Sequence, residues 1–237
     1  MKKIVQKSED RGHADHGWLD ARHSFSFASY FDRNHLQFGA LRVLNDDIIT
    51  PTMGFGSHPH DNMDIVTIPL SGALKHRDNT GTEEVIKTGD VQIMSAGSGI
   101  VHSEYNASHQ EKVNLLQIWV FPKVEDIKPR YEQKTFDVAG RKNKFQIIVS
   151  PNKEEGGVWI NQDSWFSLGA FDKDASATYN VHQKGNGVYF FLISGSSTIA
   201  GETLNKRDAI GISDFESADI TFSEGSELLA IEVPMTV

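Results

Sequence analysis

Two short segments in the first half of the chain carry residues with the types and spacing of metal ligands. The segment GFGSHPH (54–60) places His58 and His60 two positions apart, and GSGIVHSEYN (97–106) does the same for His102 and Glu104. Residues i and i+2 of a β-strand point to the same face of its sheet. Two such pairs on neighbouring antiparallel strands would bring four side chains to one point.

Three imidazoles and one carboxylate make a ligand set that accepts Fe, Mn, Ni, Cu or Zn. A mononuclear site of this kind usually leaves a coordination position for water or substrate, which catalysis requires. One His-x-His pair alone has low specificity in a chain with ten histidines. The prediction of a metal site therefore depends on the two pairs together.

The elements that position these residues are expected to be strands. Glycines recur between short runs rich in Val, Ile, Phe and Thr, and long stretches of helical periodicity are missing, which is typical of an antiparallel sandwich or barrel. The clearest runs are Ile65–Leu70, Val91–Met94, Leu115–Phe121, Phe145–Val149, Val188–Ile193 and Leu228–Val233.

The chain also repeats itself weakly. The end of one apolar run, LSG (70–72), is echoed by ISG (193–195), and TGDVQI (88–93) by KRDAIG (206–211). This repetition predicts two similar β domains, over residues 1–125 and 126–237. The charged stretch 122–144 is expected to be the linker between them, with a surface loop inside one domain as the alternative.

The segments around the ligand pairs resemble a known family. The glycine and histidine frame is similar to the two motifs of the cupin superfamily, and several longer segments resemble the pirin family. These segments are RGHADHGWLDARHSFSFASYFD (11–32), FGALRVLNDD (38–47), GFGSHPHDNMDIVTIPLSG (54–72), KHRDNTG (75–81) and GDVQIMSAGSGIVHSE (89–104).

The resemblance implies an all-β bicupin fold of two antiparallel β-barrel (jelly-roll) domains, with the metal in the first only. It assigns the ligands to His58, His60, His102 and Glu104. Many cupins take their carboxylate from a position four residues after the second histidine, and Asp64 stands there in this chain. Asp64 shares the parity of the two histidines and is therefore the alternative to Glu104.

The second half of the chain lacks an equivalent ligand set. Alignment on the repeated glycine places Val181 and Gln183 where His58 and His60 stand, and alignment on the repeated aspartate places Ile220 and Phe222 opposite the second pair. These side chains are poor ligands, so the C-terminal domain is expected to be free of metal.

Composition narrows the functional classes. The formal net charge of -9 disfavours direct binding to nucleic acid. The absence of cysteine excludes disulfides and thiolate zinc sites and is compatible with a reducing compartment. The N-terminal residues carry no apolar signal segment, and no apolar run is long enough to span a bilayer. We expect a cytoplasmic protein that is a monomer.

The resemblance implies two functions of different class. One is a metal-dependent dioxygenase similar to quercetin 2,3-dioxygenase, which opens the heterocyclic ring of a flavonol with O2 and releases CO. Glu104 would then be both ligand and catalytic base, and iron(II) is the preferred ion, with Cu, Ni, Mn or Zn as alternatives. The other is a redox-sensing regulatory protein that acts through protein partners and has no substrate.

Overall fold

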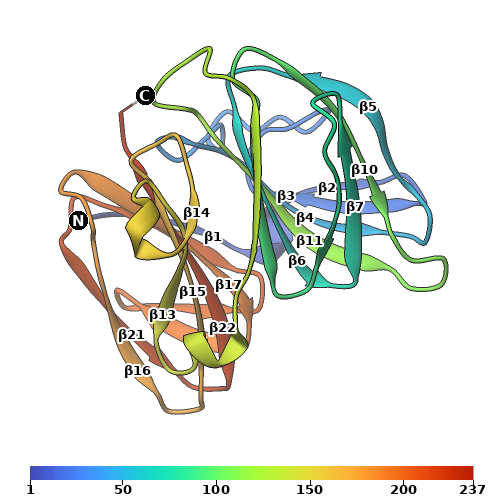
Figure 1. Ribbon diagram of the computed structural model, residues 1–237. Coiled ribbons are helices and arrows are strands. Elements are labelled where there is room, and N and C mark those ends of the chain that lie inside the picture. The colour runs from blue at the N-terminus through green and yellow to red at the C-terminus, as the bar shows by residue number, and fades with distance from the viewer. Residues whose placement is uncertain (237) are drawn as a thin grey trace.

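The computed structural model describes residues 1–236, and its regular secondary structure is almost wholly β-strand (Figure 1). Val237, the last residue of the expected second domain, lies outside the described residues. The six β-type runs of the sequence each coincide with a strand to within two residues, which confirms the all-β prediction. None of the helices within residues 1–236 has the length and apolar character that a membrane crossing needs.

The N-terminal domain packs a seven-stranded sheet against a four-stranded sheet. Its strands are β2 (Gly12–Asp15), β3 (Leu19–His23), β4 (Leu41–Ile49), β5 (Gly54–His60), β6 (Asp64–Ser71), β7 (Ala73–Asp78), β8 (Glu83–Lys87), β9 (Asp90–Ser95), β10 (Ile100–Asn106), β11 (Val113–Val120) and β12 (Arg130–Thr135). The large sheet has the order β12-β9-β6-β11-β4-β3-β2, and the small one β5-β10-β7-β8. The two sheets form a jelly-roll sandwich and do not close into a barrel, which confirms the jelly-roll prediction.

The C-terminal domain repeats this plan. Its strands are β1 (Lys2–Gln6), β13 (Phe145–Ser150), β14 (Val158–Trp159), β15 (Trp165–Phe171), β16 (Ser176–Asn180), β17 (Asn186–Ser194), β18 (Ser196–Ile199), β19 (Glu202–Asn205), β20 (Ala209–Ser213), β21 (Ser217–Phe222) and β22 (Ser226–Pro234). The sheet orders are β1-β20-β17-β22-β15-β13-β14 and β16-β21-β18-β19. The described residues also form three short 3-10 helices, η1 (Ser8–Asp10), η2 (Val138–Arg141) and η3 (Lys153–Glu155).

The two domains exchange strands. Strand β1, at the N-terminus, pairs with β20 of the second domain, whereas β12 pairs with β9 of the first. Strand β12 lies inside the charged segment 122–144, and an edge strand tolerates charged side chains because one of its edges faces solvent. The expected domains were residues 1–125 and 126–237. Each large sheet nevertheless takes one strand from the other side of residue 125, because β1 joins the second domain and β12 joins the first.

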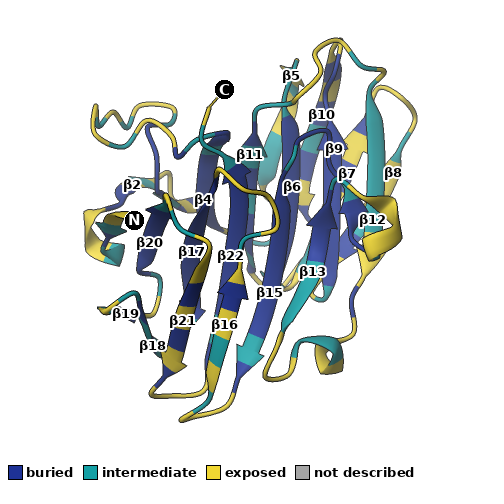
Figure 2. Cartoon of the chain, turned by 90° about the vertical axis from the view of Figure 1, so that its left-hand side faces the viewer, coloured by how far each residue is buried: buried dark blue, intermediate teal, exposed yellow. Residues whose placement is uncertain are grey.

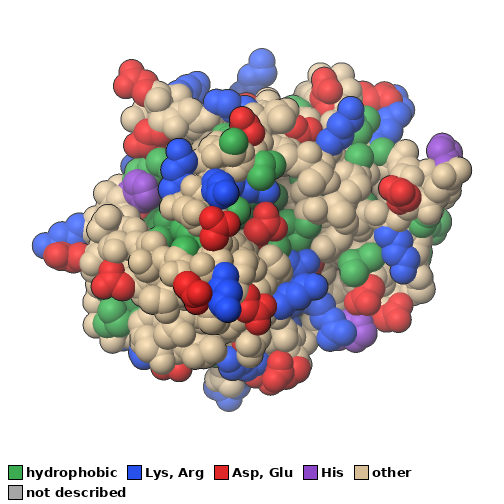
Figure 3. Space-filling model, turned by 90° about the horizontal axis from the view of Figure 1, so that it is seen from below, with side chains coloured by type: hydrophobic (Ala, Val, Ile, Leu, Met, Phe, Trp, Pro, Cys, Tyr) green, Lys and Arg blue, Asp and Glu red, His purple; other side chains and the backbone are tan. Residues whose placement is uncertain are grey.

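The two large sheets pack back to back. The largest apolar cluster joins Leu44 and Val66 of the first domain to Phe191 and Ile231 of the second, and the central strands are buried along most of their length (Figure 2). The second sandwich also has one continuous interior cluster. The interior of the first is divided into two small clusters, which leaves room for polar residues between its sheets. On the face in Figure 3, acidic and basic side chains are interspersed.

Candidate metal centre

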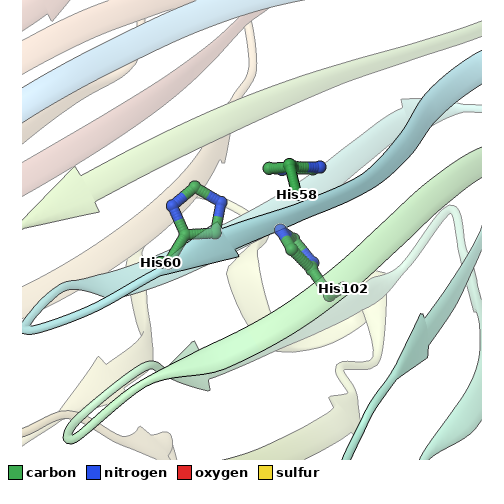
Figure 4. A group of neighbouring side chains, drawn as sticks. All are labelled: His58, His60 and His102. Atoms are coloured by element: carbon green, nitrogen blue, oxygen red, sulfur yellow. The ribbon is translucent and has the colours of Figure 1, made fainter.

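Three histidine rings meet on the paired strands β5 and β10. In this pairing His102 lies opposite His58, and Ile100 lies opposite His60. One ring nitrogen from each of the three histidines lies within 4.8 Å of the others. Figure 4 shows the rings gathered beside the two strands, and their centroids are 4.4–4.9 Å apart. The structure therefore brings together three of the four residues expected from strand parity in one group.

The approach of the two strands depends on local backbone features. A Cβ atom on Gly54 would lie 2.1 Å from the carbonyl oxygen of Glu104, so only glycine allows this contact. The register of the β5–β10 pair also shifts between His102 and Glu104: His102 pairs with His58, whereas Glu104 pairs with Phe55. Such a bulge changes the direction of neighbouring side chains. The glycine-rich start of β5 thus sets how its histidines face β10.

The hydrogen bonds around these rings leave nitrogen lone pairs free. His58 donates from Nδ1 to the carbonyl oxygen of Gly56 at 2.7 Å, so its Nε2 keeps a lone pair. Nε2 of His102 is buried without a hydrogen-bond partner among the described residues. Leaving such an atom unsatisfied costs about 1–3 kcal/mol. Imidazole nitrogen is a good ligand for transition metals, so this donor set fits a divalent metal ion.

The environment keeps the rings neutral. Burial, followed by the neighbouring charge of His58, lowers the pKa of His60 to about 4. Burial, followed by the charges of His58 and His60, lowers the pKa of His102 to about 2. Only a neutral imidazole binds a metal. At neutral pH both rings are therefore in the form that a metal requires.

Glu104 joins the cluster through His102. It belongs to a second group of buried candidate ligands, which His76, His102 and Glu104 form. Its Oε2 accepts a hydrogen bond from Nε2 of Gln117 at 2.7 Å, and Nε1 of Trp119 donates to Gln117 Oε1 at 3.3 Å. Burial raises the pKa of Glu104 to about 7, against the opposing effect of Gln117. His102 is common to both groups, so the side chains form one continuous cluster.

Asp64, the alternative carboxylate, lies elsewhere. It begins β6, and its Oδ2 accepts a hydrogen bond from the backbone N–H of Asn161 at 2.7 Å, in the second half of the chain. Asp64 is buried but belongs to neither group of candidate ligands within residues 1–236. This carboxylate serves the contact between the domains.

The matching positions of the second domain hold packing residues. Ile220 and Phe222 lie in the apolar interior of the second sandwich, and Val181 packs against it. Gln183 donates its backbone N–H to Glu232. Both groups of candidate metal ligands within the described residues lie in the first domain.

His76 and Asp78 form a buried pair behind the three-histidine group, and neither is among the metal ligands predicted from the sequence. Their His76 Nε2 to Asp78 Oδ2 distance is 3.0 Å, and His76 Nδ1 lies 3.5 Å from Nδ1 of His102. Burial would raise the pKa of Asp78, but hydrogen bonds from Thr80, His76 and Thr82 outweigh it and lower the pKa to about 2. The i, i+2 spacing of His76 and Asp78 is the signal that could have found them.

Two cavities border the cluster. The inner cavity has a volume of about 220 Å³, and the outer cleft has about 580 Å³. His60 and Trp119 line both, so they form the wall between the two spaces. The inner cavity is lined by Leu19, Ala21, His23, Phe27, Asn45, Asp47, Phe55, His58, His60, Glu104, Gln117 and Trp119.

Asp47 is the unusual residue of the inner cavity. Its side chain is buried, and its Oδ1 has no hydrogen-bond partner among the described residues. Burial, together with the nearby charges of Asp46 and Glu104, raises the pKa of Asp47 well above its ordinary value. Among the apolar and polar residues that line the inner cavity, Asp47 is therefore a polar group that is available to a ligand.

Comparison with known proteins extends over both domains. A family model described as pirin matches residues 4–120, and one described as the quercetinase C-terminal cupin domain matches residues 147–233. The chain is 41% identical to a protein named quercetin 2,3-dioxygenase from Escherichia coli K12, over 97% of this chain and 98% of that protein. The crystal structure of YhhW from Escherichia coli has a TM-score of 0.95 at 40% identity, with 100% and 99% of the two chains covered. A structure of bacterial pirin YhhW in complex with nickel(II), from the same organism, has a TM-score of 0.93 at 39% identity and full coverage of both chains.

Proposed function

This chain belongs to the pirin family, and we propose that it is a metal-dependent dioxygenase that opens the heterocyclic ring of a flavonol-like substrate with O2. One observation carries the proposal: a histidine cluster with an unpartnered buried nitrogen borders a cavity that has aromatic walls. The relatives named quercetin 2,3-dioxygenase supply the substrate class.

We propose that His58, His60, His102 and Glu104 hold the metal and that the native ion is iron(II). When bound, such an ion supplies Lewis acidity, which lowers the pKa of a substrate hydroxyl, and redox chemistry with O2. The similar pirin in complex with nickel(II) supports a divalent ion. Copper, nickel, manganese and zinc are the alternative ions.

The inner cavity is the proposed seat of the substrate. Phe27, Phe55 and Trp119 line this cavity, and their rings would exclude water and contact a flat aromatic molecule. His60 lies against Trp119, with ring centroids 4.9 Å apart, so the seat borders the metal ligands directly. Asp47 offers a hydrogen-bonding group to a hydroxyl on the buried part of the substrate.

Glu104 is the proposed catalytic base. Gln117 holds Oε2 of Glu104, so Oε1 is the oxygen that would bind the metal and, when that bond is loose, receive the proton of the substrate hydroxyl. A base is most effective when its pKa lies close to the working pH. Burial raises the pKa of Glu104 to about 7 in the metal-free protein. The indole N–H of Trp119 supports this arrangement because it donates to Gln117 and thereby orients the amide.

The test is oxygen uptake with quercetin by protein of verified metal content, together with detection of released CO. We expect turnover by the wild type and none by His60→Ala. His109→Ala, which removes an exposed histidine outside both ligand groups, is the matched control and keeps its activity. A metal-loaded wild type that consumes quercetin no faster than background oxidation would refute the proposed activity.

A further inference from the structure

A row of hydrogen-bonding groups runs from a turn after β7 to the metal-facing side of His102. We infer that His76 and Asp78 are positioning residues, which fix the tautomer of His102 and keep its Nε2 free for a metal ion. The inference rests on the proposed metal site, but it does not depend on dioxygenase activity.

The row begins at Asp78, whose two oxygens have different partners. Oδ1 accepts from the backbone N–H of Thr80 at 2.8 Å, from the Thr80 hydroxyl at 2.7 Å and from the N–H of Thr82 at 3.2 Å. Oδ2 faces Nε2 of His76 at 3.0 Å. With three donors on one oxygen, the carboxylate cannot rotate without losing hydrogen bonds.

The direction of each hydrogen bond follows from this anchor. An ionised carboxylate only accepts, so Nε2 of His76 carries the proton. The neutral ring then presents a lone pair at Nδ1, which lies 3.5 Å from Nδ1 of His102. A single proton between these nitrogens must belong to His102. Nε2 of His102 is then unprotonated, and this is the atom that has no partner among the described residues.

Strand pairing and packing hold the row in place. In the β7–β10 register, Asp78 lies opposite His102 and His76 lies opposite Glu104. His76 is fully buried, and the Tyr131 ring packs against it with a centroid distance of 4.9 Å. Partners of this kind orient metal-binding imidazoles in known sites, where their loss weakens metal affinity about 10–100-fold.

The substitution Asp78→Asn is a sharp test because it keeps the shape of the side chain. The three donors at Oδ1 require the amide oxygen at that position, so the NH2 group faces Nε2 of His76. The proton of His76 then moves to Nδ1, where it faces Nδ1 of His102. Nδ1 of His102 must now accept this hydrogen bond, so His102 carries its own proton on Nε2.

We expect Asp78→Asn to weaken Ni(II) binding about 10–100-fold, measured by chelator competition at fixed pH. His76→Phe keeps a ring against Tyr131 but removes the acceptor, and it gives a similar loss. Asp208→Asn is the control, since Asp208 is also buried and accepts backbone N–H groups, from Ser8 and Asn205, in the other domain. Its Ni(II) affinity stays at the wild-type value.

Long-range ¹H–¹⁵N NMR of the metal-free protein supplies a readout that a merely structural role would not change. The wild type should show the proton of His102 on Nδ1, and Asp78→Asn should move it to Nε2. Wild-type Ni(II) affinity in both variants, or an Nε2 proton on His102 in the wild type, overturns the inference. If the wild type binds no Ni(II), the proposed metal site fails, whereas the tautomer measured without metal still decides whether the row exists.

Discussion

Replacing Glu104 by glutamine keeps the size of the side chain but removes its charge, and we expect this change to stabilise the metal-free protein above pH 7. Burial raises the pKa of Glu104 from its ordinary value of 4.5 to about 7, although the hydrogen bond from Gln117 opposes the shift. The unfolded chain therefore loses this proton near pH 4.5, while the folded protein keeps it to about pH 7.

The magnitude follows from proton linkage. Between the two pKa values the folded state binds more protons than the unfolded state, so the free energy of unfolding falls as the pH rises. Each tenfold change in a protonation equilibrium is worth about 1.4 kcal/mol. The interval from 4.5 to about 7 therefore corresponds to a loss of about 3 kcal/mol, which is absent below pH 4.5 and complete above pH 7.

The assay is urea denaturation of chelator-treated wild type and Glu104→Gln at pH 4.5 and at about pH 8. All other residues are the same in both proteins, so the difference between the two proteins isolates Glu104. We expect similar stability at the lower pH and an advantage of about 3 kcal/mol for the variant at the higher pH. A stability difference that does not change with pH would refute the reasoning.

Three further changes test other parts of the structure. Asp47→Leu removes a buried carboxylate whose Oδ1 has no hydrogen-bond partner among the described residues, so we expect higher stability in urea. We also expect about tenfold weaker binding of quercetin, measured by tryptophan fluorescence, and little change in the binding of 3-hydroxyflavone. Equal losses for both ligands would contradict a contact with the additional hydroxyls. Asp64→Ala leaves the N–H of Asn161 unpaired and should lower the free energy of unfolding by about 1–3 kcal/mol without changing Ni(II) affinity; weaker Ni(II) binding would count against its separation from the site. Deleting residues 1–7 removes β1 from the edge of β20 and should lower the melting temperature, and an unchanged value would show that the exchanged strand adds no stability.

Much of the fold follows from local sequence patterns. The apolar runs and the glycines between them predict the strands because residue type and turn chemistry act over a few positions. The edge strand β12 was missed, since its residues, RYEQKT, are polar and only partly buried. An apolar pattern arises only where a strand has a buried face, so such a strand looks like a linker in the sequence.

The i, i+2 spacing determined that His58 and His60 share one face of their strand, because side chains alternate along any strand whatever surrounds it. Only the tertiary structure decided which strands become neighbours. The β7–β10 register placed Asp78 opposite His102 and His76 opposite Glu104. Contact between the domains brought Asp64 to Asn161. These outcomes depend on pairing and packing between segments far apart in the chain, and strand parity alone carries no information about them.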